Sequence, residues 1–388
     1  MDASLVALVL WMKSGGDSEG EGMVSRAMEA NVLDHVERAS RVEAIGPIIV
    51  VTDSPNLVET LHDSPAIVET GADLEVLPFG ENLASVIEKY SKKHSFDGLL
   101  YMGGGSGVFM EGEDLMRLTR AVRTSPEILF VNSFYSTDFA GFGRAFSLEA
   151  LRRCQSDNQI GWVLGREEGR ETRVLPPGLM TRFDIDTPAD LMILKVHPPR
   201  SPHLSEILSS LSIDVSPVYQ LMDVLVRREA SVMVMGRVTP EAALFFDKET
   251  ACHLRFYIEE RGLKARKERG NGETWSLAGL CLERIGALAF FETLSAHLEG
   301  VILDSRVLFH HLELQPLRRD RFFSDLLRPG EITDPSVRRF TEEALESPIP
   351  ILLGGHTLVS GGLYALAESA WRRAEKPLGQ DVNSSNWG

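Results

Sequence analysis

Cysteine is scarce in this sequence. Among 388 residues, only Cys154, Cys252 and Cys281 occur, far apart and without a CxxC pair. This number and spacing provide neither a disulfide framework nor a cysteine-based zinc site. Such cysteine usage fits a reducing compartment, so we expect the protein to be cytoplasmic.

Long hydrophobic runs are also missing. No stretch approaches the roughly 20 apolar residues that a membrane-spanning helix needs. The apolar run at residues 5–12 is short and follows no basic segment, so we do not expect a signal peptide. The sequence contains no internal repeat, no low-complexity block, no GxxxxGKS/T loop and no GxGxxG fingerprint.

Basic residues are outnumbered by acidic ones. The chain has 40 lysines and arginines against 56 acidic residues, which gives a formal net charge of -16. This charge argues against non-specific binding to nucleic acid and against docking on an anionic membrane. A small anionic ligand stays compatible with the charge, because a local basic pocket can form in an acidic protein. The oligomeric state is not indicated.

Buried strands and helices alternate in the first half of the chain. Continuous apolar runs are typical of strands buried on both faces of a parallel sheet. The expected strands are 5–12, 48–52, 74–77, 98–102 and 128–131, and the expected helices are 24–42, 82–92, 114–122 and 187–194. The alternation predicts an α/β fold with a mostly parallel sheet that helices cover on both faces.

A proline-rich segment separates this pattern from a different one. Residues 197–202 read HPPRSP, a stiff connector that predicts a boundary between domains at 1–198 and 199–388. Helices at 204–211, 218–227, 240–246 and 277–298, with strands at 232–235 and 349–353, are expected beyond it. We therefore predict a second, mainly helical α+β domain of unknown role.

A glycine-rich loop follows the first strand. Gly15 and Gly16 can present backbone N–H groups to phosphate oxygens, and Lys13 and Arg26 can add positive charge. Three acidic residues in the same loop would repel a triphosphate. The alternative is a solvated acidic loop.

Two aspartates stand two positions apart near the end of the first half. In an extended segment, Asp184 and Asp186 point to the same side and can hold Mg²⁺ through carboxylate oxygens. The alternative is that they end a strand and cap the helix that starts at Thr187. Convergence of a further carboxylate, such as Asp53 or Asp138, would favour the metal site.

The segment 183–191 (FDIDTPADL) resembles the D-I-D-T-P-x-D-L signature of the MobA-like and CofC-like nucleotidyltransferases. Other segments match in the expected order over about residues 5–198. These are 7–10 (ALVL), 25–28 (SRAM), 48–53 (IIVVTD), 80–85 (GENLAS), 99–107 (LLYMGGGSG) and 132–142 (NSFYSTDFAGF). The resemblance implies a Rossmann-like, GT-A-type three-layer sandwich.

The resemblance also implies an activity and residue roles. The activity is Mg²⁺-dependent transfer of a nucleotidyl group from an NTP to a small phosphorylated or hydroxylated acceptor. Arg26 takes the place of the phosphate-binding lysine, and Asp184 and Asp186 hold the metal. Residues implied in nucleotide binding are Lys13, Gly15, Gly16, Gly80, Asn82, Ser85, Gly103, Gly104 and Gly105.

Three positions depart from the family pattern. Trp11 stands where small residues approach phosphate, Gly105 stands where a metal-binding aspartate is expected, and Arg26 replaces lysine. An alternative function is therefore a catalytically degenerate protein that binds a nucleotide or sugar-nucleotide and regulates another process. The glycines at 103–107 either admit a phosphate or mark a loop that lost its catalytic side chains.

The second half offers two further candidates. Gly355 and His356 lie between an expected strand and helix, where they either bind an anion or allow close helix packing. Residues 304–311 are expected to be extended, so that His310 and His311 face opposite ways and make poor joint metal ligands. The arginines at 318–321 either contact phosphate or form an ion-pair cluster or solvated face.

Overall fold

The computed structural model describes residues 5–70, 77–143, 146–259 and 275–375. Its first sheet has seven strands in the order β3-β2-β1-β4-β6-β5-β7, and only β6 runs antiparallel to its neighbours. The strands are β1 (Val6–Met12), β2 (Ile45–Thr52), β3 (Ile67–Glu69), β4 (Gly98–Gly103), β5 (Leu129–Val131), β6 (Phe139–Gly143) and β7 (Thr172–Val174).

Helices cover both faces of this sheet. They are α1 (Glu19–Ser40), α2 (Pro55–Thr60), α3 (Phe79–Ser91), α4 (Gly112–Thr124) and α5 (Leu148–Arg152). Two further helices of the first half, α6 (Leu179–Arg182) and α7 (Pro188–Val196), pack toward the second half, where α6 contacts α16 and α7 contacts β11. In β1, Leu8 and Leu10 pack with α1 and α4, whereas Val9 packs with α3 and α5 on the other face. The predicted three-layer α/β sandwich is confirmed.

The segment 74–77 and strand β6 are the places in the first sheet where expectation and structure are compared next. Part of the strand expected at 74–77 lies outside the described residues. Strand β6 was not expected, because Gly141 and Gly143 weaken its pattern. Both glycines allow close packing: a Cβ atom at Gly141 would lie 2.7 Å from a side-chain carbon of Val122 on α4, and one at Gly143 would lie 2.2 Å from Pro126.

The second half contains a parallel sheet of four strands. It comprises β8 (Ser231–Gly236), β9 (His253–Ile258), β10 (Gly300–Asp304) and β11 (Ile351–Gly354), in the order β11-β10-β8-β9. All three pairings are parallel. Helices do predominate in this half, but the expected α+β arrangement is wrong, because parallel strands joined through helices form an α/β unit.

The helices of the second half are α8 (Pro202–Ser210), α9 (Ser216–Leu225), α10 (Pro240–Glu249), α12 (Leu277–Ser295), α13 (Ser305–His311), α14 (Arg318–Asp325), α15 (Pro335–Glu346) and α16 (Gly361–Ala374). The expected extended conformation of 304–311 is wrong, since His310 and His311 end helix α13. None of the helices in the described ranges is long and apolar enough to cross a membrane.

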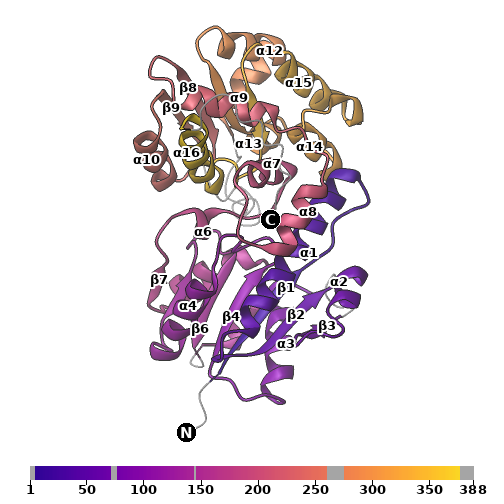
Figure 1. Ribbon diagram of the computed structural model, residues 1–388, viewed down its shortest axis with the longest axis vertical. Coiled ribbons are helices and arrows are strands. Elements are labelled where there is room, and N and C mark those ends of the chain that lie inside the picture. The colour runs from indigo at the N-terminus through magenta and orange to yellow at the C-terminus, as the bar shows by residue number, and fades with distance from the viewer. Residues whose placement is uncertain (1–4, 71–76, 144–145, 260–274, 376–388) are drawn as a thin grey trace, which may run out of the picture.

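One hydrophobic core joins helices of the first half to the second sheet. It contains Met23 and Val24 from α1, Leu191 from α7, and Val234 and Leu352 from the second sheet. Figure 1 shows the two sheets one above the other, with α7 between them and with α1, α8 and α14 along one side. The division at residue 198 stays a prediction.

Candidate functional site

The site predicted for the first half lies at the carboxyl ends of β1 and β4. These neighbouring strands run parallel, so the loops that follow them leave the same edge of the sheet. The segment before α7 crosses this edge, where the Ile185 N–H donates to the Gly105 carbonyl at 3.0 Å. The fold thus brings Asp184 and Asp186 to the glycine loop after β4.

Asp184 lies among other carboxylates. Burial raises its pKa well above the ordinary value, and the charges of Asp186, Asp138, Asp190 and Asp157 raise it further. Its Oδ1 atom is buried and has no hydrogen-bond partner. Of the further carboxylates considered from the sequence, Asp138 does approach Asp184, whereas Asp53 accepts a hydrogen bond from the Ser14 N–H at 2.6 Å.

Asp157 is a member of this group that the sequence did not indicate. It follows α5, far from residue 184 in sequence, and it accepts a hydrogen bond from the Tyr101 hydroxyl at 3.1 Å. Burial raises the pKa of Asp157 to about 6, and the charge of Asp186 contributes to the increase. Only the folded chain brings these aspartates together, so no local motif could have found Asp157.

The helix that follows Asp184 and Asp186 is capped by another residue. Asp190 Oδ2 accepts hydrogen bonds from the backbone N–H groups of Asp186 at 2.9 Å and Thr187 at 2.7 Å. Asp190 and Thr187 form a capping box at the start of α7. Because Asp190 provides the cap, the Asp184 and Asp186 side chains are not needed for it.

Gly105 occupies a position where a side chain would not fit. A Cβ atom there would lie 2.5 Å from the Ile185 carbonyl oxygen and 2.9 Å from Asp184 Oδ1. The Asp184 carboxylate thus lies beside the position from which a residue 105 side chain would extend. The aspartate that the resemblance leads one to expect at 105 could be restored only by moving residues 184 and 185.

The rest of the glycine loop packs tightly against its surroundings. The Gly103 N–H donates to the Asp138 carbonyl at 2.9 Å, and the Gly104 N–H donates to the Trp11 carbonyl at 2.8 Å. Asn31 Nδ2 on α1 donates to the Gly104 carbonyl at 2.9 Å. These two backbone donors are therefore engaged within the protein, and the glycines permit close packing against β1 and α1.

The loop after β1 also has internal partners. The Gly15 N–H donates to Ser25 Oγ at 2.6 Å. The Glu21 carboxylate caps α1 together with Ser18, and a Cβ atom at Gly16 would lie 2.7 Å from its oxygens. An acidic side chain thus lies against the glycines of this loop. Lys13 and Arg26 are both exposed near it.

The start of α3 lies over the same edge of the sheet. Phe79 makes edge-on contacts with Trp11 and Tyr101, with ring centroids 5.4 and 5.1 Å apart. Gly80 packs against α5, since a Cβ atom there would lie 1.9 Å from the Leu151 carbonyl oxygen. The other two predicted nucleotide contacts differ in exposure: Asn82 is buried and Ser85 is exposed.

The carboxyl edge of the second sheet holds buried ion pairs. Asp304 at the end of β10 is 0% exposed, and Arg237 donates to its two oxygens at 2.6 and 3.1 Å. Although burial raises the pKa of Asp304, the charges of Arg237, His356 and Arg306 hold it below the usual value. The candidate His356 therefore lies near Asp304, with Gly355 buried beside it.

Gly236 explains how Arg237 reaches Asp304. Its φ angle is 127°, and a Cβ atom there would lie 2.3 Å from the Asp304 Cβ. Both the backbone conformation and the space require glycine at this position. The ion pair between Arg237 and Asp304 was not predicted, since a possible ion-pair cluster was considered only for the arginines at 318–321.

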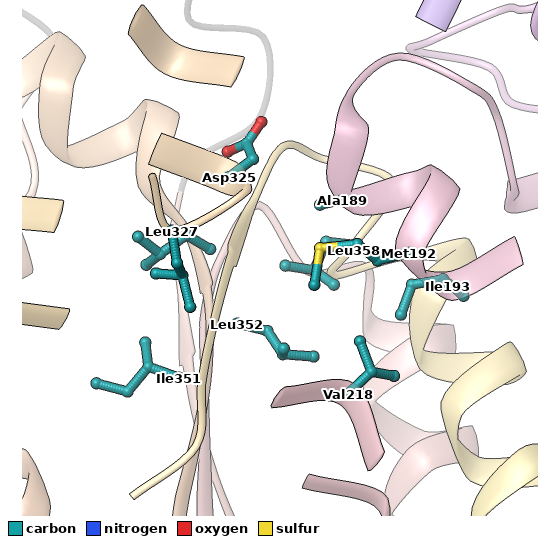
Figure 2. Close-up of a pocket in the computed structure, with 10 residues that line it drawn as sticks. Ala189, Met192, Ile193, Val218, Asp325, Leu327, Ile351, Leu352 and Leu358 are labelled. Carbon is teal, nitrogen blue, oxygen red and sulfur yellow. The ribbon is translucent and has the colours of Figure 1, made fainter. Parts of the chain in front are cut away.

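Two further observations concern a void beside β11 and the grouping of possible metal ligands. The apolar void beside β11, lined by Met192, Ile193 and Val218 among others, measures about 10 Å³ and has room for at most about one water molecule (Figure 2). Within the described ranges, no three histidine, cysteine or acidic side chains are grouped so that they could hold a metal ion on their own.

Comparison with known proteins gives partial likenesses. No family model matches the sequence, and no curated protein matches it. A structure described as a nucleotide-diphospho-sugar transferase from Desulfovibrio desulfuricans G20 is 16% identical and has a TM-score of 0.40. The match covers 54% of this chain and 100% of that one.

Two further solved structures are similar over about the same share of the chain. A cytidylyltransferase from Leptospira borgpetersenii is 15% identical, with a TM-score of 0.37 and coverage of 54% of this chain and 99% of that one. A CMP:2-keto-3-deoxy-manno-octonic acid synthetase complexed with CTP is 17% identical, with a TM-score of 0.35 and coverage of 48% and 95%.

Proposed function

We propose that the first half is a nucleotidyltransferase of the MobA-like and CofC-like kind, which transfers a nucleotidyl group from an NTP to a small phosphorylated or hydroxylated acceptor. The observation that carries the proposal is the Asp184 carboxyl group. Its Oδ1 atom is buried without a hydrogen-bond partner, and four further carboxylates raise its pKa. A buried carboxylate in such surroundings is costly unless a cation or a proton compensates it.

Mg²⁺ fits these residues as the compensating cation. Asp184 and Asp186 would hold it through carboxylate oxygens, the ligand type that this hard cation takes. Since no three suitable side chains of the described residues form a complete metal cage, nucleotide phosphates and water would supply the remaining ligands. When bound, the ion supplies neutralisation of the phosphate charge.

The chain's own residues would position the reactants. Arg26 and Lys13 are exposed near the loop after β1 and would contact the phosphates of the NTP. The acceptor oxygen would attack the α-phosphorus in line. A bond forms between that oxygen and phosphorus while the bond from the α-phosphorus to the bridging oxygen breaks, and pyrophosphate leaves. Where the acceptor group is a hydroxyl, its proton passes to water. Positioning and charge neutralisation would provide most of the acceleration.

A second candidate function is binding without turnover. It is favoured by the loop after β1, where Ser14 and Gly15 already donate their N–H groups to Asp53 and Ser25. It is also favoured by Gly105, where no side chain could act as a metal ligand. Such a protein would bind a nucleotide or sugar-nucleotide and act as a regulatory module.

Thermal-shift titration tests the proposal. Each of the four NTPs is added with and without Mg²⁺ to wild type, to Asp186→Ala, and to Glu346→Gln, which removes an exposed carboxylate from α15. Binding to the folded state raises the melting temperature by mass action, by several degrees when the ligand is at about 100 times its Kd. We expect a Mg²⁺-dependent rise with one NTP that Asp186→Ala loses and Glu346→Gln keeps.

The other outcomes separate the two functions. A Mg²⁺-dependent rise without pyrophosphate release across an acceptor panel would favour the binding module over the enzyme. If no NTP changes the melting temperature of wild type, the transferase proposal fails, and the buried ion pairs of the second sheet become the place to search.

A further inference from the structure

Helix α14 of the second half packs on the beginning of α1. A Cβ atom at Gly20 would lie 3.2 Å from the Phe322 Cβ, and Arg328 forms an ion pair with Glu19 at 3.0 Å. Figure 1 shows α14 close to the end of α1 that follows the loop after β1. Side chains on α14 are therefore close to the loop proposed to hold phosphates.

The arginines of α14 have an excess of positive charge around them. Arg306 is already paired with Asp325, with Nη1 to Oδ1 at 2.7 Å and Nη2 to Oδ2 at 2.5 Å. Within the described part of the chain, neither Arg318 nor Arg321 forms an ion pair. The Arg321 Nε atom is buried and has no hydrogen-bond partner. Burial lowers the pKa of Arg321, and the charges of Arg306 and Arg318 lower it further.

Besides Asp325, which is already paired with Arg306, Glu21 supplies a negative charge at this place. Its carboxylate accepts from the Ser18 hydroxyl at 2.6 Å and from the Ser18 N–H at 3.3 Å. It lies against Gly16, and it interacts electrostatically with Arg321. One anionic group therefore both lies against the glycine loop and acts on Arg321.

We propose that a polyphosphate binds between the loop after β1 and helix α14, displaces the Glu21 carboxylate, and takes Arg321 and Arg318 as cationic ligands. The inference rests on the proposed function, because the polyphosphate would be that of the NTP. It gives the second half a role: this half adds positive charge to that of Lys13 and Arg26 beside the acidic loop of the first half. Without the ligand, the Glu21 carboxylate occupies the position that the polyphosphate would take.

The charges favour this exchange. A triphosphate carries several negative charges, whereas Glu21 carries one. The triphosphate therefore neutralises the positive charge of two adjacent guanidinium groups more fully. Arginine suits the role because its planar fork donates two parallel hydrogen bonds to a phosphate. The first turn of α1 adds a favourable dipole for the same anion.

Isothermal titration calorimetry with inorganic tripolyphosphate tests the inference. Arg321→Gln is compared with Arg319→Gln, a matched control on the same helix whose guanidinium lies over the Phe323 ring at 5.5 Å. We expect Arg321→Gln to weaken binding about tenfold or more, and Arg319→Gln to leave it unchanged. We expect Glu21→Gln to tighten binding, because glutamine keeps the capping box but removes the competing charge.

Several results would overturn the inference. These are equal affinities for Arg321→Gln and Arg319→Gln, weaker binding by Glu21→Gln, or no binding of tripolyphosphate by wild type. Circular dichroism checks that each variant is folded. If Arg321→Gln does not fold, Glu21→Gln decides alone, since unchanged affinity contradicts displacement and tighter binding supports it.

The two proposals can fail separately. Arg321-dependent tripolyphosphate binding, in a protein that shows no Mg²⁺-dependent response to any NTP, supports this inference and contradicts the proposed function. An NTP response that Asp186→Ala abolishes but Arg321→Gln leaves intact supports the proposed function and contradicts this inference.

Discussion

His35 on α1 is a buried histidine beneath the glycine loop. Its Nε2 atom lies 2.9 Å from the Ser106 carbonyl oxygen, and because a carbonyl only accepts, Nε2 carries the hydrogen. Burial lowers the pKa of His35 to about 4, and the positive charge of Arg38 acts in the same direction. The neutral imidazole is therefore part of the folded structure.

This histidine makes stability depend on pH. Between pH 6.5 and pH 4, the unfolded chain binds a proton that folded His35 does not, so the free energy of unfolding falls as the pH falls. Relative to His35→Gln, we expect wild type to lose about 2 kcal/mol between pH 7 and pH 5. Urea denaturation of both proteins at each pH measures this difference.

The comparison with His35→Gln isolates one group. Other groups that titrate in this window, such as Asp157 with its pKa raised to about 6 by burial, are present in both proteins and cancel. Glutamine can still donate to the Ser106 carbonyl. An equal loss of stability in the two proteins would show that His35 is not the titrating group.

At the residue scale, the sequence predicted the pair formed by Asp184 and Asp186 but not its surroundings. The spacing of the two aspartates gives their side of an extended segment, and that is local information. The surroundings of Asp184 include the close approach of Gly105 and the charge of Asp157, both of which are distant in sequence. The roles implied for Arg26 and Lys13 stay predictions, because both side chains are exposed and the fold alone does not place them on a ligand.

Among the elements, α3 and α5 are held together at Gly80. This glycine was predicted from the resemblance to lie near a nucleotide, and its N–H donates to the Cys154 carbonyl at 2.9 Å. Because a Cβ atom would lie 1.9 Å from the Leu151 carbonyl oxygen, any side chain must push the two helices apart. Gly80 therefore has a packing role whether or not a nucleotide binds.

Two glycine-to-alanine substitutions separate packing from helix propensity. We expect Gly80→Ala to destabilise the protein by about 2 kcal/mol, because the backbone has to move. At Gly22 in α1, the nearest atom to an added Cβ is 3.6 Å away, so Gly22→Ala should stabilise by about 0.5–1 kcal/mol. Thermal or urea unfolding measures both; equal effects would contradict the packing argument.

The elements that the sequence predicted best are long and locally determined. Strand β1 and helix α1 follow from an apolar run and from helical spacing. Strand β9 was missed because it is a half-exposed edge strand that carries Arg255, and β10, although buried along its whole length, was missed as well. The parallel pairing of the second sheet is a long-range property, which explains why an α+β unit was predicted in its place.

At the scale of the whole molecule, the predicted domain boundary at residue 198 can be tested, because residues from both halves pack in one hydrophobic core. Met23, Val24 and Ala27 on α1 belong to the same apolar cluster as Val232 and Ile302 in the second sheet. A chain that stopped at the proline-rich connector would expose these α1 residues to water, at a cost of about 25 cal/mol for each Å² of apolar surface.

We expect a fragment of residues 1–198 to lose cooperative unfolding and to bind a hydrophobic dye, as partly packed states do. Mixing it with a fragment of residues 199–388 should restore a single transition if the halves fold as one unit. Calorimetry and dye fluorescence measure both properties. A fragment 1–198 that melts in one sharp transition near that of the full chain would contradict this expectation and support an independent first domain.

Helix α1 belongs to two cores at once. Its first half packs in the core that contains α7 and the second sheet, while Val32, Val36 and Ala39 pack in a core of the first sheet. With 22 residues it is a rod of about 33 Å. A helix anchored in this way opposes a hinge motion between the halves, because moving them apart would pull one end of α1 out of its core. A polyphosphate at the proposed site should therefore enter through rearrangement of side chains such as Glu21, not through a wide opening and closing of the molecule.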